Sequence, residues 1–130
     1  MKINIIVVAS AIITTLIACN KPVYKCNKEF EGNWLTEVIY DSTLQINVQS
    51  QLKIEGEDGL YKGICQPCAD GTFCSCIANH AGKAVMNSTK TEMKIGTGGN
   101  TYPLKIDEEP NIGSDGKWTM KIVGLRFYRQ

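Results

Sequence analysis

The chain has 130 residues, with 14 lysines and arginines against 13 aspartates and glutamates, so its formal net charge is +1 at pH 7. A balance this close to neutral argues against nucleic acid or another polyanion as a partner. The length is enough for one domain with a single modest core and too short for two.

The amino-terminal segment is apolar and ends at a cysteine. Lys2 precedes residues 3–19, which carry no charge and close on the sequence Leu-Ile-Ala-Cys at Cys19. This pattern resembles the signal peptide of bacterial lipoproteins, in which the cysteine is lipidated and the chain is cleaved on its amino side. The resemblance implies that residues 1–18 are removed. A retained transmembrane helix is the alternative, but such a helix needs about 20 apolar residues.

The same resemblance implies where the mature chain is held. Residues 19–29 are expected to form the lipidated terminus and a tether, and residues 30–130 a single domain. Acyl chains such as palmitate on Cys19 would hold the protein on a membrane, because each buried methylene contributes about 0.8 kcal/mol. Asn20 stands where Gram-negative lipoproteins retained in the inner membrane have aspartate. The expected location is therefore the outer membrane.

From residue 32 onward, apolar and polar residues alternate with period two. In the clearest stretch Val48, Leu52 and Ile54 share one face, and clusters of Gly, Asn, Asp or Pro interrupt the alternation about every 8 to 12 residues. Strands are expected at 72–78, 83–88, 91–96 and 101–106, and turns at 57–59, 97–100 and 123–124. The pattern predicts an all-β fold, a small antiparallel meander barrel of about eight strands with little or no helix, since open sheet edges invite association.

The start of this domain contains a Gly-x-Trp motif, Gly32-Asn33-Trp34, preceded by Phe30. The motif resembles the entry strand of lipocalins and of short lipocalin-like lipoprotein domains, which are barrels of the calycin type. The resemblance implies that Trp34 plugs one end of the barrel and that a late arginine, Arg126 or Arg129, packs on it by a cation–π contact. Avidin-like barrels share this entry, and Trp34 as an ordinary core aromatic of another β domain is the alternative.

Four cysteines, Cys65, Cys68, Cys74 and Cys76, lie within one short segment. A disulfide-stapled hairpin is the favoured interpretation, because lipoproteins fold outside the reducing cytoplasm and a bridge contributes about 2 to 4 kcal/mol. A two-residue turn at 70–71 would place Cys65 opposite Cys76 and Cys68 one step from Cys74, which predicts these two pairs. Cys26 is then left over, although it could instead take one of the four as its partner.

Two other interpretations of the cluster remain open. The cysteines, with His80, could bind zinc or copper, but the spacing between the two cysteine pairs is shorter than in usual structural zinc sites. The Cys65-x-x-Cys68 pair could be redox-active, but such pairs usually need a helix start to lower one thiol pKa. The sequence favours neither.

No spacing in the chain sets up catalysis. His80 is the only histidine, it lies in a predicted surface turn at residues 79–82, and no serine or cysteine near it completes a triad motif. We therefore expect a protein that is not an enzyme and uses no cofactor or metal. It would bind a small apolar ligand in an unfilled barrel cavity, or a protein on the barrel rim. Tyr24-Lys25-Cys26 also resembles the mature start of lysozyme-inhibitor lipoproteins, which implies a periplasmic inhibitor as an alternative.

Overall fold

The computed structural model describes residues 21–66 and 74–130, apart from the side chains of Cys26 and of residues 74–78. The predicted signal segment, the lipidation site Cys19 and Cys68 lie outside the described residues. No helix in the described ranges is long and apolar enough to cross a membrane.

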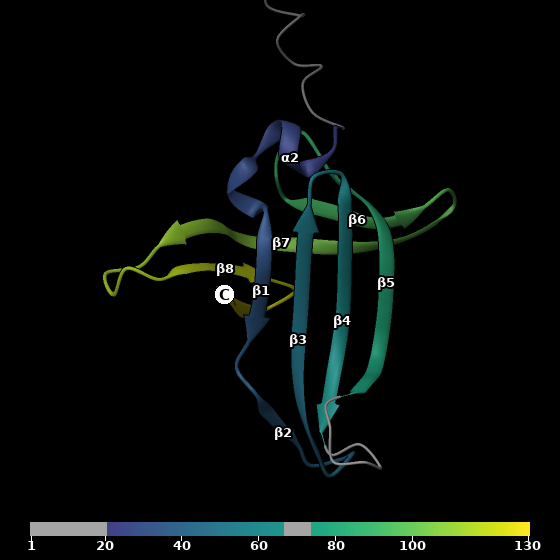
Figure 1. Cartoon of the computed structure of the whole chain (residues 1–130), viewed down its shortest axis with the longest axis vertical. Helices are drawn as coiled ribbons and strands as arrows, with labels where there is room; N and C mark the ends of the chain where they lie inside the picture. The colour runs from purple at the N-terminus through teal and green to yellow at the C-terminus, as the bar shows by residue number, and fades with distance from the viewer. Residues whose placement is uncertain (1–20, 67–73) are drawn as a thin grey trace, which may run out of the picture.

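Strands make up most of the described chain (Figure 1). Two short helices come first, α2 (Val23–Cys26) and the 3-10 helix η1 (Lys28–Phe30). The strands are β1 (Gly32–Thr36), β2 (Ile39–Asp41), β3 (Ile46–Glu55), β4 (Asp58–Gln66), β5 (Cys74–Met86), β6 (Glu92–Thr97), β7 (Asn100–Ile112), β8 (Trp118–Ile122) and β9 (Leu125–Arg129).

Eight of these strands close into a barrel. From β3 to β9 each strand pairs with its neighbour in sequence, and β1 pairs with both β9 and β3, all antiparallel. β2 is an additional strand that pairs only with β3 among the described strands. The predicted all-β meander barrel of about eight strands is confirmed, and the closure leaves β2 as the exposed edge.

The core fills the barrel with side chains from alternate positions. Leu52 and Ile54 of β3 are buried, as the period-two pattern predicts. Twelve large side chains are fully buried: Val23, Phe30, Trp34, Leu52, Ile54, Met86, Met93, Ile95, Leu104, Met120, Ile122 and Phe127. Bulky side chains from β1, β3, β5, β6, β7, β8 and β9 meet here. The part of the interior beside Trp34 is therefore packed.

The last hairpin turns as the sequence predicts. Val123 and Gly124 have φ of 51° and 76° and connect Ile122 to Leu125, which are directly opposite each other. Positive φ at both central residues is the geometry that matches the twist of a two-residue hairpin. Asp107 supports the turn, because its carboxylate accepts a hydrogen bond from the Gly124 amide at 2.7 Å.

The predicted turn at residues 79–82 is wrong, because β5 runs through it. His80 lies opposite Tyr61 within the sheet. Gly82, with φ of 146°, comes so close to β6 that a Cβ there would lie 2.5 Å from the carbonyl carbon of Gly96. Glycine here permits a close approach of two backbones within the sheet and does not end the strand.

Trp34 closes one end of the barrel. Its side chain is 0% exposed, and its indole N–H donates to the carbonyl of Phe30 at 2.9 Å. The guanidinium of Arg129 lies 4.6 Å from the ring centres of both Trp34 and Trp118. It also donates to the backbone carbonyl of Glu29, while burial lowers the pKa of Arg129. The cation–π contact predicted for a late arginine is therefore made by Arg129.

Arg126, the other candidate for that contact, faces elsewhere. It forms an ion pair with Glu108 of β7, with 2.9 Å between nitrogen and oxygen. This pair lies on the outside of the barrel and is half exposed.

The segment before β1 packs on the same end of the barrel. Pro22 forms a β-bridge with Val85, the Lys21 carbonyl accepts a hydrogen bond from the Met86 amide at 3.4 Å, and Val23 is buried in the core. From Lys21 onward, the predicted tether is thus held against β5. We call the end of the barrel covered by α2, η1 and Trp34 the closed end.

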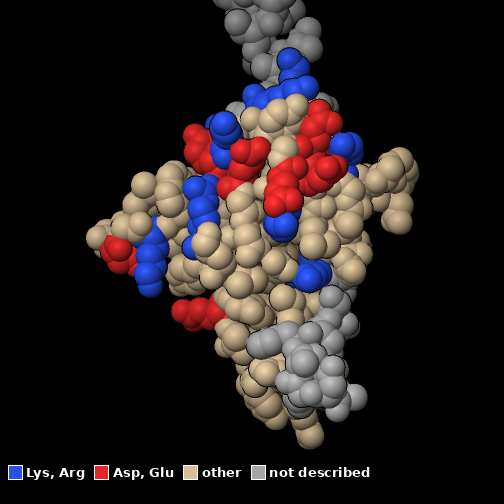
Figure 2. Space-filling view, viewed as in Figure 1, with Lys and Arg blue, Asp and Glu red and all other residues tan. Residues whose placement is uncertain are grey.

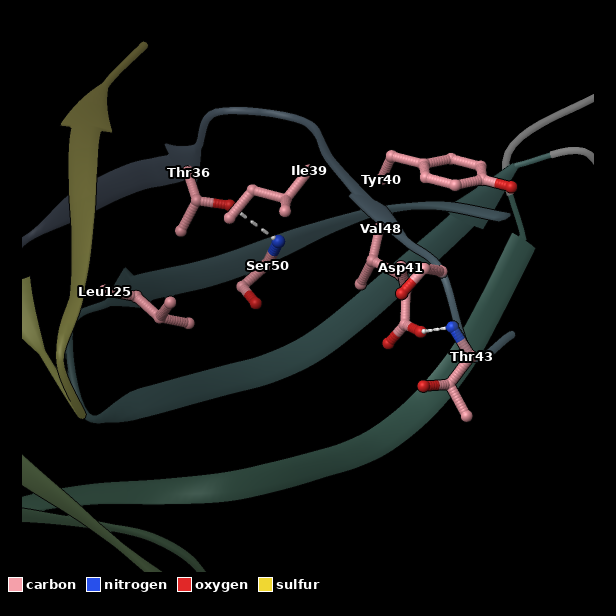
Figure 3. A pocket seen from close by; sticks show the side chains of 9 residues that line it. Thr36, Ile39, Tyr40, Asp41, Thr43, Val48, Ser50 and Leu125 are labelled. Carbon is pink, nitrogen blue, oxygen red and sulfur yellow. Dashed lines mark hydrogen bonds between the residues drawn. The ribbon is translucent and has the colours of Figure 1, made fainter. Parts of the chain in front are cut away.

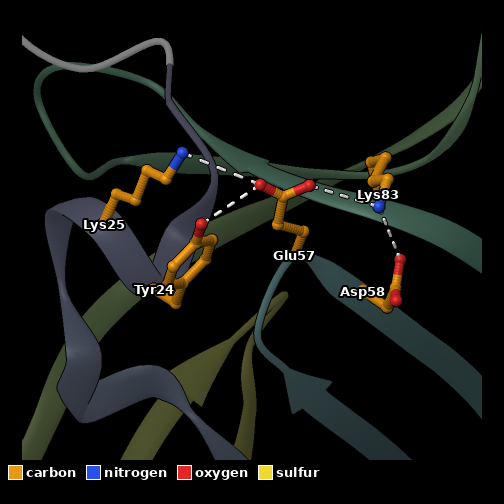
Figure 4. Close-up of polar contacts among 5 residues, drawn as sticks. All are labelled: Tyr24, Lys25, Glu57, Asp58 and Lys83. Atoms are coloured by element: carbon orange, nitrogen blue, oxygen red, sulfur yellow. Dashed lines mark hydrogen bonds and ion pairs between the residues drawn. The ribbon is translucent and has the colours of Figure 1, made fainter.

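A polar network fastens α2 to the closed end (Figure 4). Glu57, in the turn between β3 and β4, accepts from the Tyr24 hydroxyl at 3.1 Å and pairs with Lys25 at 3.7 Å and Lys83 at 3.3 Å. Lys83 also reaches Asp58 at 3.0 Å. The Tyr24 hydrogen bond, followed by that from Lys83, lowers the pKa of Glu57. Tyr24 and Lys25, the residues on which the lysozyme-inhibitor alternative depends, thus serve a structural role at this end.

Glu57→Gln is expected to lower the melting temperature at pH 7 and to lower it less at about pH 3. The pKa of Glu57 in the folded protein lies below its ordinary value of 4.5. Its ionised form therefore stabilises the fold above that value, and the stabilisation is lost as the pH falls through the folded pKa. Thermal melts at the two pH values measure the difference.

Glu55→Gln is the matched control, because Glu55 pairs only with Lys53 of its own strand among the described residues. It should lower the melting temperature less than Glu57→Gln at pH 7. An effect of Glu57→Gln that stays constant down to pH 3 would mean that the ion pairs do not stabilise the fold.

Candidate functional site

The end of the barrel opposite α2 is incompletely closed. β1 and β9 remain paired as far as Thr36 and Phe127. Beyond Thr36 the chain leaves β9, passes Glu37 and Val38, and continues as β2 on the edge of β3 alone. β2 therefore diverges from the start of β9, and a gap opens between the two strands. We call this the open end.

A pocket of about 430 Å³ occupies the open end. Figure 3 shows side chains from β1, β2, β3 and β9 turned toward one space. Its lining residues are Thr36, Ile39, Tyr40, Asp41, Ser42, Thr43, Val48, Ser50 and Leu125. The volume lies within the range of small-molecule sites, about 300 to 1,000 Å³.

Thr36 forms the floor of the pocket and is fixed by three hydrogen bonds. Its hydroxyl accepts from the Ser50 amide at 2.9 Å and donates to the Glu37 carbonyl at 2.9 Å. Its carbonyl accepts from the Gln49 side chain at 2.8 Å. Because Thr36 is itself buried and lies opposite Phe127 of the core, the pocket ends where the packed interior begins.

The walls of the pocket are apolar at one end and charged at the other. Leu125, Ile39 and Val48 supply the apolar side chains, whereas Asp41 supplies the only carboxylate among the described residues of the lining. One oxygen of Asp41 accepts hydrogen bonds from the amides of Thr43 at 2.8 Å and of Leu44 at 2.9 Å, which hold the turn after β2.

A second hollow of about 230 Å³ adjoins the pocket and shares Thr36, Ile39 and Leu125 with it. Its remaining lining includes Glu37 and Arg126, of which Arg126 is already paired with Glu108. The two hollows together form one groove between β2 and the β8–β9 turn.

The surface around the groove is apolar. Val38, Ile39, Tyr40 and Leu44 are 49% to 62% exposed. Figure 2 shows that, on the face in view and among the described residues, most Lys, Arg, Asp and Glu side chains gather over the half of the molecule that bears α2. Large side chains of this kind exposed together mark sites of ligand or partner binding.

Three aromatic rings stack on one another, and two of them, Tyr61 and Tyr102, pack against the core. The ring of Tyr102 lies 5.8 Å from that of Tyr61 and 4.0 Å from that of His80, with nearly parallel planes. Burial raises the pKa of Tyr61, and a hydrogen bond with Ser50 partly offsets the rise. His80 is engaged in this stack, a role that its predicted place in a turn did not suggest.

Trp34, the predicted plug, lines none of the described pockets. It is separated from the open end by the packed core, so a ligand cavity directly beneath it is not present in the described interior. The sequence did not indicate Ile39, Asp41 or Leu125 as site residues. The signal that could have indicated them is the apolar run at residues 38–40, which follows the end of β1.

The cysteine cluster is described only in part. The backbone register places Cys65 opposite Cys74, not opposite Cys76 as predicted. The cause is a pair of register shifts on either side of Gly63. Beyond them, the pairing of β4 with β5 is offset from the regular register that holds between Asp58 and Lys62. Cys65 is 2% exposed, and the described part of the chain contains no free cysteine.

Residues directly opposite each other in an antiparallel pair have Cα atoms about 4.5 to 5.5 Å apart, a separation that suits a disulfide. The disulfides stay a prediction, as do the metal and redox alternatives, because Cys68 and the side chains of Cys74 and Cys76 lie outside the described residues.

Comparisons of this chain with protein-family models, with curated proteins and with solved structures gave no match. The chain is a small closed β-barrel. One end holds a partly apolar pocket, and the opposite end is plugged by Trp34 and carries charged residues. Such an arrangement can hold a small molecule.

Proposed function

We propose that this chain is a lipid-anchored, non-catalytic binding module of the outer membrane, and that its ligand is a small apolar molecule bound at the open end. The observation that carries the proposal is the pocket of about 430 Å³ between β2, β3 and Leu125. Among the described residues, its lining supplies apolar side chains and one carboxylate but no imidazole and no thiol.

The closed end supports the proposed likeness to lipocalin-type barrels. The 3-10 helix η1 leads directly into the Gly32-x-Trp34 strand, and Arg129 of the last strand covers Trp34. The contact of Arg129 with Trp34 is the one that the resemblance implies for this part of the chain.

The position of the proposed anchor supports binding at the open end. Lys21 is held against Met86 at the closed end, and a single residue, Asn20, separates it from Cys19. Because one residue spans at most about 3.6 Å, acyl chains on Cys19 would hold the closed end near the membrane. The pocket would then face away from the lipid, toward solvent and diffusing ligands.

The proposal predicts that Ile39→Arg weakens binding of an apolar probe. Ile39 lines both hollows and is 55% exposed, so arginine there would place a charge in the groove without disturbing the core. Burial of an isoleucine side chain is worth about 1.5 to 3 kcal/mol, which corresponds to a loss of affinity of about tenfold or more. Fluorescence titration with the neutral dye N-phenylnaphthylamine measures it.

Ile112→Arg is the matched control. Ile112 is 58% exposed on β7 and lines none of the described pockets, so its substitution should leave the affinity unchanged. If the wild-type chain does not bind the dye or other small apolar probes, or if both variants weaken binding equally, the open end is not a small-molecule site. Recognition of a protein by the exposed side chains around the groove would then be the better account.

A further inference from the structure

We infer that the ligand of the open-end pocket is an amphiphilic monocation, an apolar molecule that carries one amine. This inference rests on the proposed function and names its ligand class. The juxtaposition that carries it is the Asp41 carboxylate at one end of a pocket whose other end is apolar.

Asp41 has a free acceptor that faces the pocket. Both amides that hold the turn, those of Thr43 and Leu44, donate to Oδ1. Among the described residues, nothing donates to Oδ2 and no lysine or arginine forms an ion pair with Asp41. A carboxylate that accepts from backbone amides still has lone pairs on its second oxygen for a ligand N–H.

The charges around the pocket favour a cation. Glu37, in the adjoining hollow, is a second carboxylate without an ion pair among the described residues. In the described part of the chain, Arg126 is the only basic residue that lines either hollow, and it forms an ion pair with Glu108 at 2.9 Å. The groove therefore carries net negative charge, which attracts an amine and repels the carboxylate of a fatty acid.

The two ends of the pocket match the two parts of such a ligand. Figure 3 shows Leu125 at the opposite side of the pocket from Asp41, with Ile39 and Val48 between them. An apolar body would contact these three side chains while its ammonium group donates to Asp41 Oδ2. Partial enclosure by the protein strengthens this ion pair relative to one in bulk water.

The test compares three ligands of similar shape: phenylbutylamine, phenylbutanol and phenylpentanoate. Calorimetric titrations use the mature chain with Cys19→Ala, so that the ligands do not partition into lipid or detergent. We expect the amine to bind about fivefold more tightly than the alcohol, as for a partly exposed ion pair, and the carboxylate to bind most weakly. Raising the salt concentration to about 1 M, where the screening length is about 3 Å, should reduce the preference.

Asp41→Asn should abolish the preference for the amine and leave the affinity for the alcohol unchanged. Asparagine keeps a side-chain oxygen for the amides of Thr43 and Leu44, so the turn is retained. Asp115→Asn is the control. Asp115 also accepts a backbone amide in a turn, that of Lys117 at 3.1 Å, but it lines neither hollow. This variant should keep the fivefold preference.

Equal binding of amine and alcohol by the wild-type chain would overturn the inference and leave the proposed function standing. A preference for the amine that survives Asp41→Asn, or an equal loss of both ligands in that variant, would also overturn it. Absence of binding for all three ligands would contradict the proposed function itself.

Discussion

Trp34→Ala is expected to lower the free energy of unfolding by about 3 to 5 kcal/mol, the usual cost of truncating a large aromatic side chain in a core. Trp34 is fully buried, contacts the guanidinium of Arg129 and donates to the Phe30 carbonyl. Its removal leaves a cavity, an uncovered arginine and an unpaired carbonyl. Urea denaturation of the purified chain measures the loss.

Two variants separate the plug from general packing. Trp118→Ala removes the other ring beneath Arg129, but Trp118 is only partly buried, so the loss should be smaller. Trp34→Phe keeps most of the volume and removes the indole N–H, and we expect an intermediate loss that remains measurable if Trp34→Ala does not fold. A cost for Trp34→Ala no larger than that for Trp118→Ala would contradict the role of Trp34 as the plug.

Cys19→Ala is expected to release the protein from the membrane. The proposed anchor is the acylated cysteine, and at about 0.8 kcal/mol per buried methylene no surface contact of the barrel would replace two or more acyl chains. In cell fractionation of a Gram-negative host, the wild-type chain should sediment with the outer membrane, whereas the variant should be almost entirely soluble. The intact mass of the wild-type chain should correspond to cleavage before Cys19 plus the acyl groups.

Cys26→Ala is the control for this prediction, because it removes a cysteine that the signal pattern does not involve. It should leave the chain on the membrane. A wild-type chain that still begins at Met1, or a Cys19→Ala variant that still sediments with the outer membrane, would refute the anchor and the location inferred from it.

Local patterns in the sequence predicted the β-strand content and the last turn. The alternation through Val48, Leu52 and Ile54 corresponds to β3, and the pair Val123-Gly124 forms the last turn. These features depend on residues close together in the chain, where side-chain period and backbone φ preferences decide the structure. The contact between Trp34 and a late arginine could be predicted only because the lipocalin resemblance implies it; the two residues lie near opposite ends of the domain sequence.

The features that the sequence did not predict depend on contacts between distant segments. Gly82 resembled a turn residue, and only the close approach of Gly96 explains why the strand continues. The register at Cys65 follows from bulges beside Gly63 that no periodicity shows. The pocket arises where β2 leaves β9, and that divergence depends on the closure of the barrel by β1 and β9, not on any local motif.

The most direct test of binding at the open end is to locate a bound apolar probe by amide chemical shifts. With N-phenylnaphthylamine added to the isotope-labelled mature chain carrying Cys19→Ala, we predict the largest shifts at Thr36, Ser50 and Leu125, with the indole N–H of Trp34 unchanged. Shifts centred on Trp34 and α2, or no saturable shifts at all, would contradict the account.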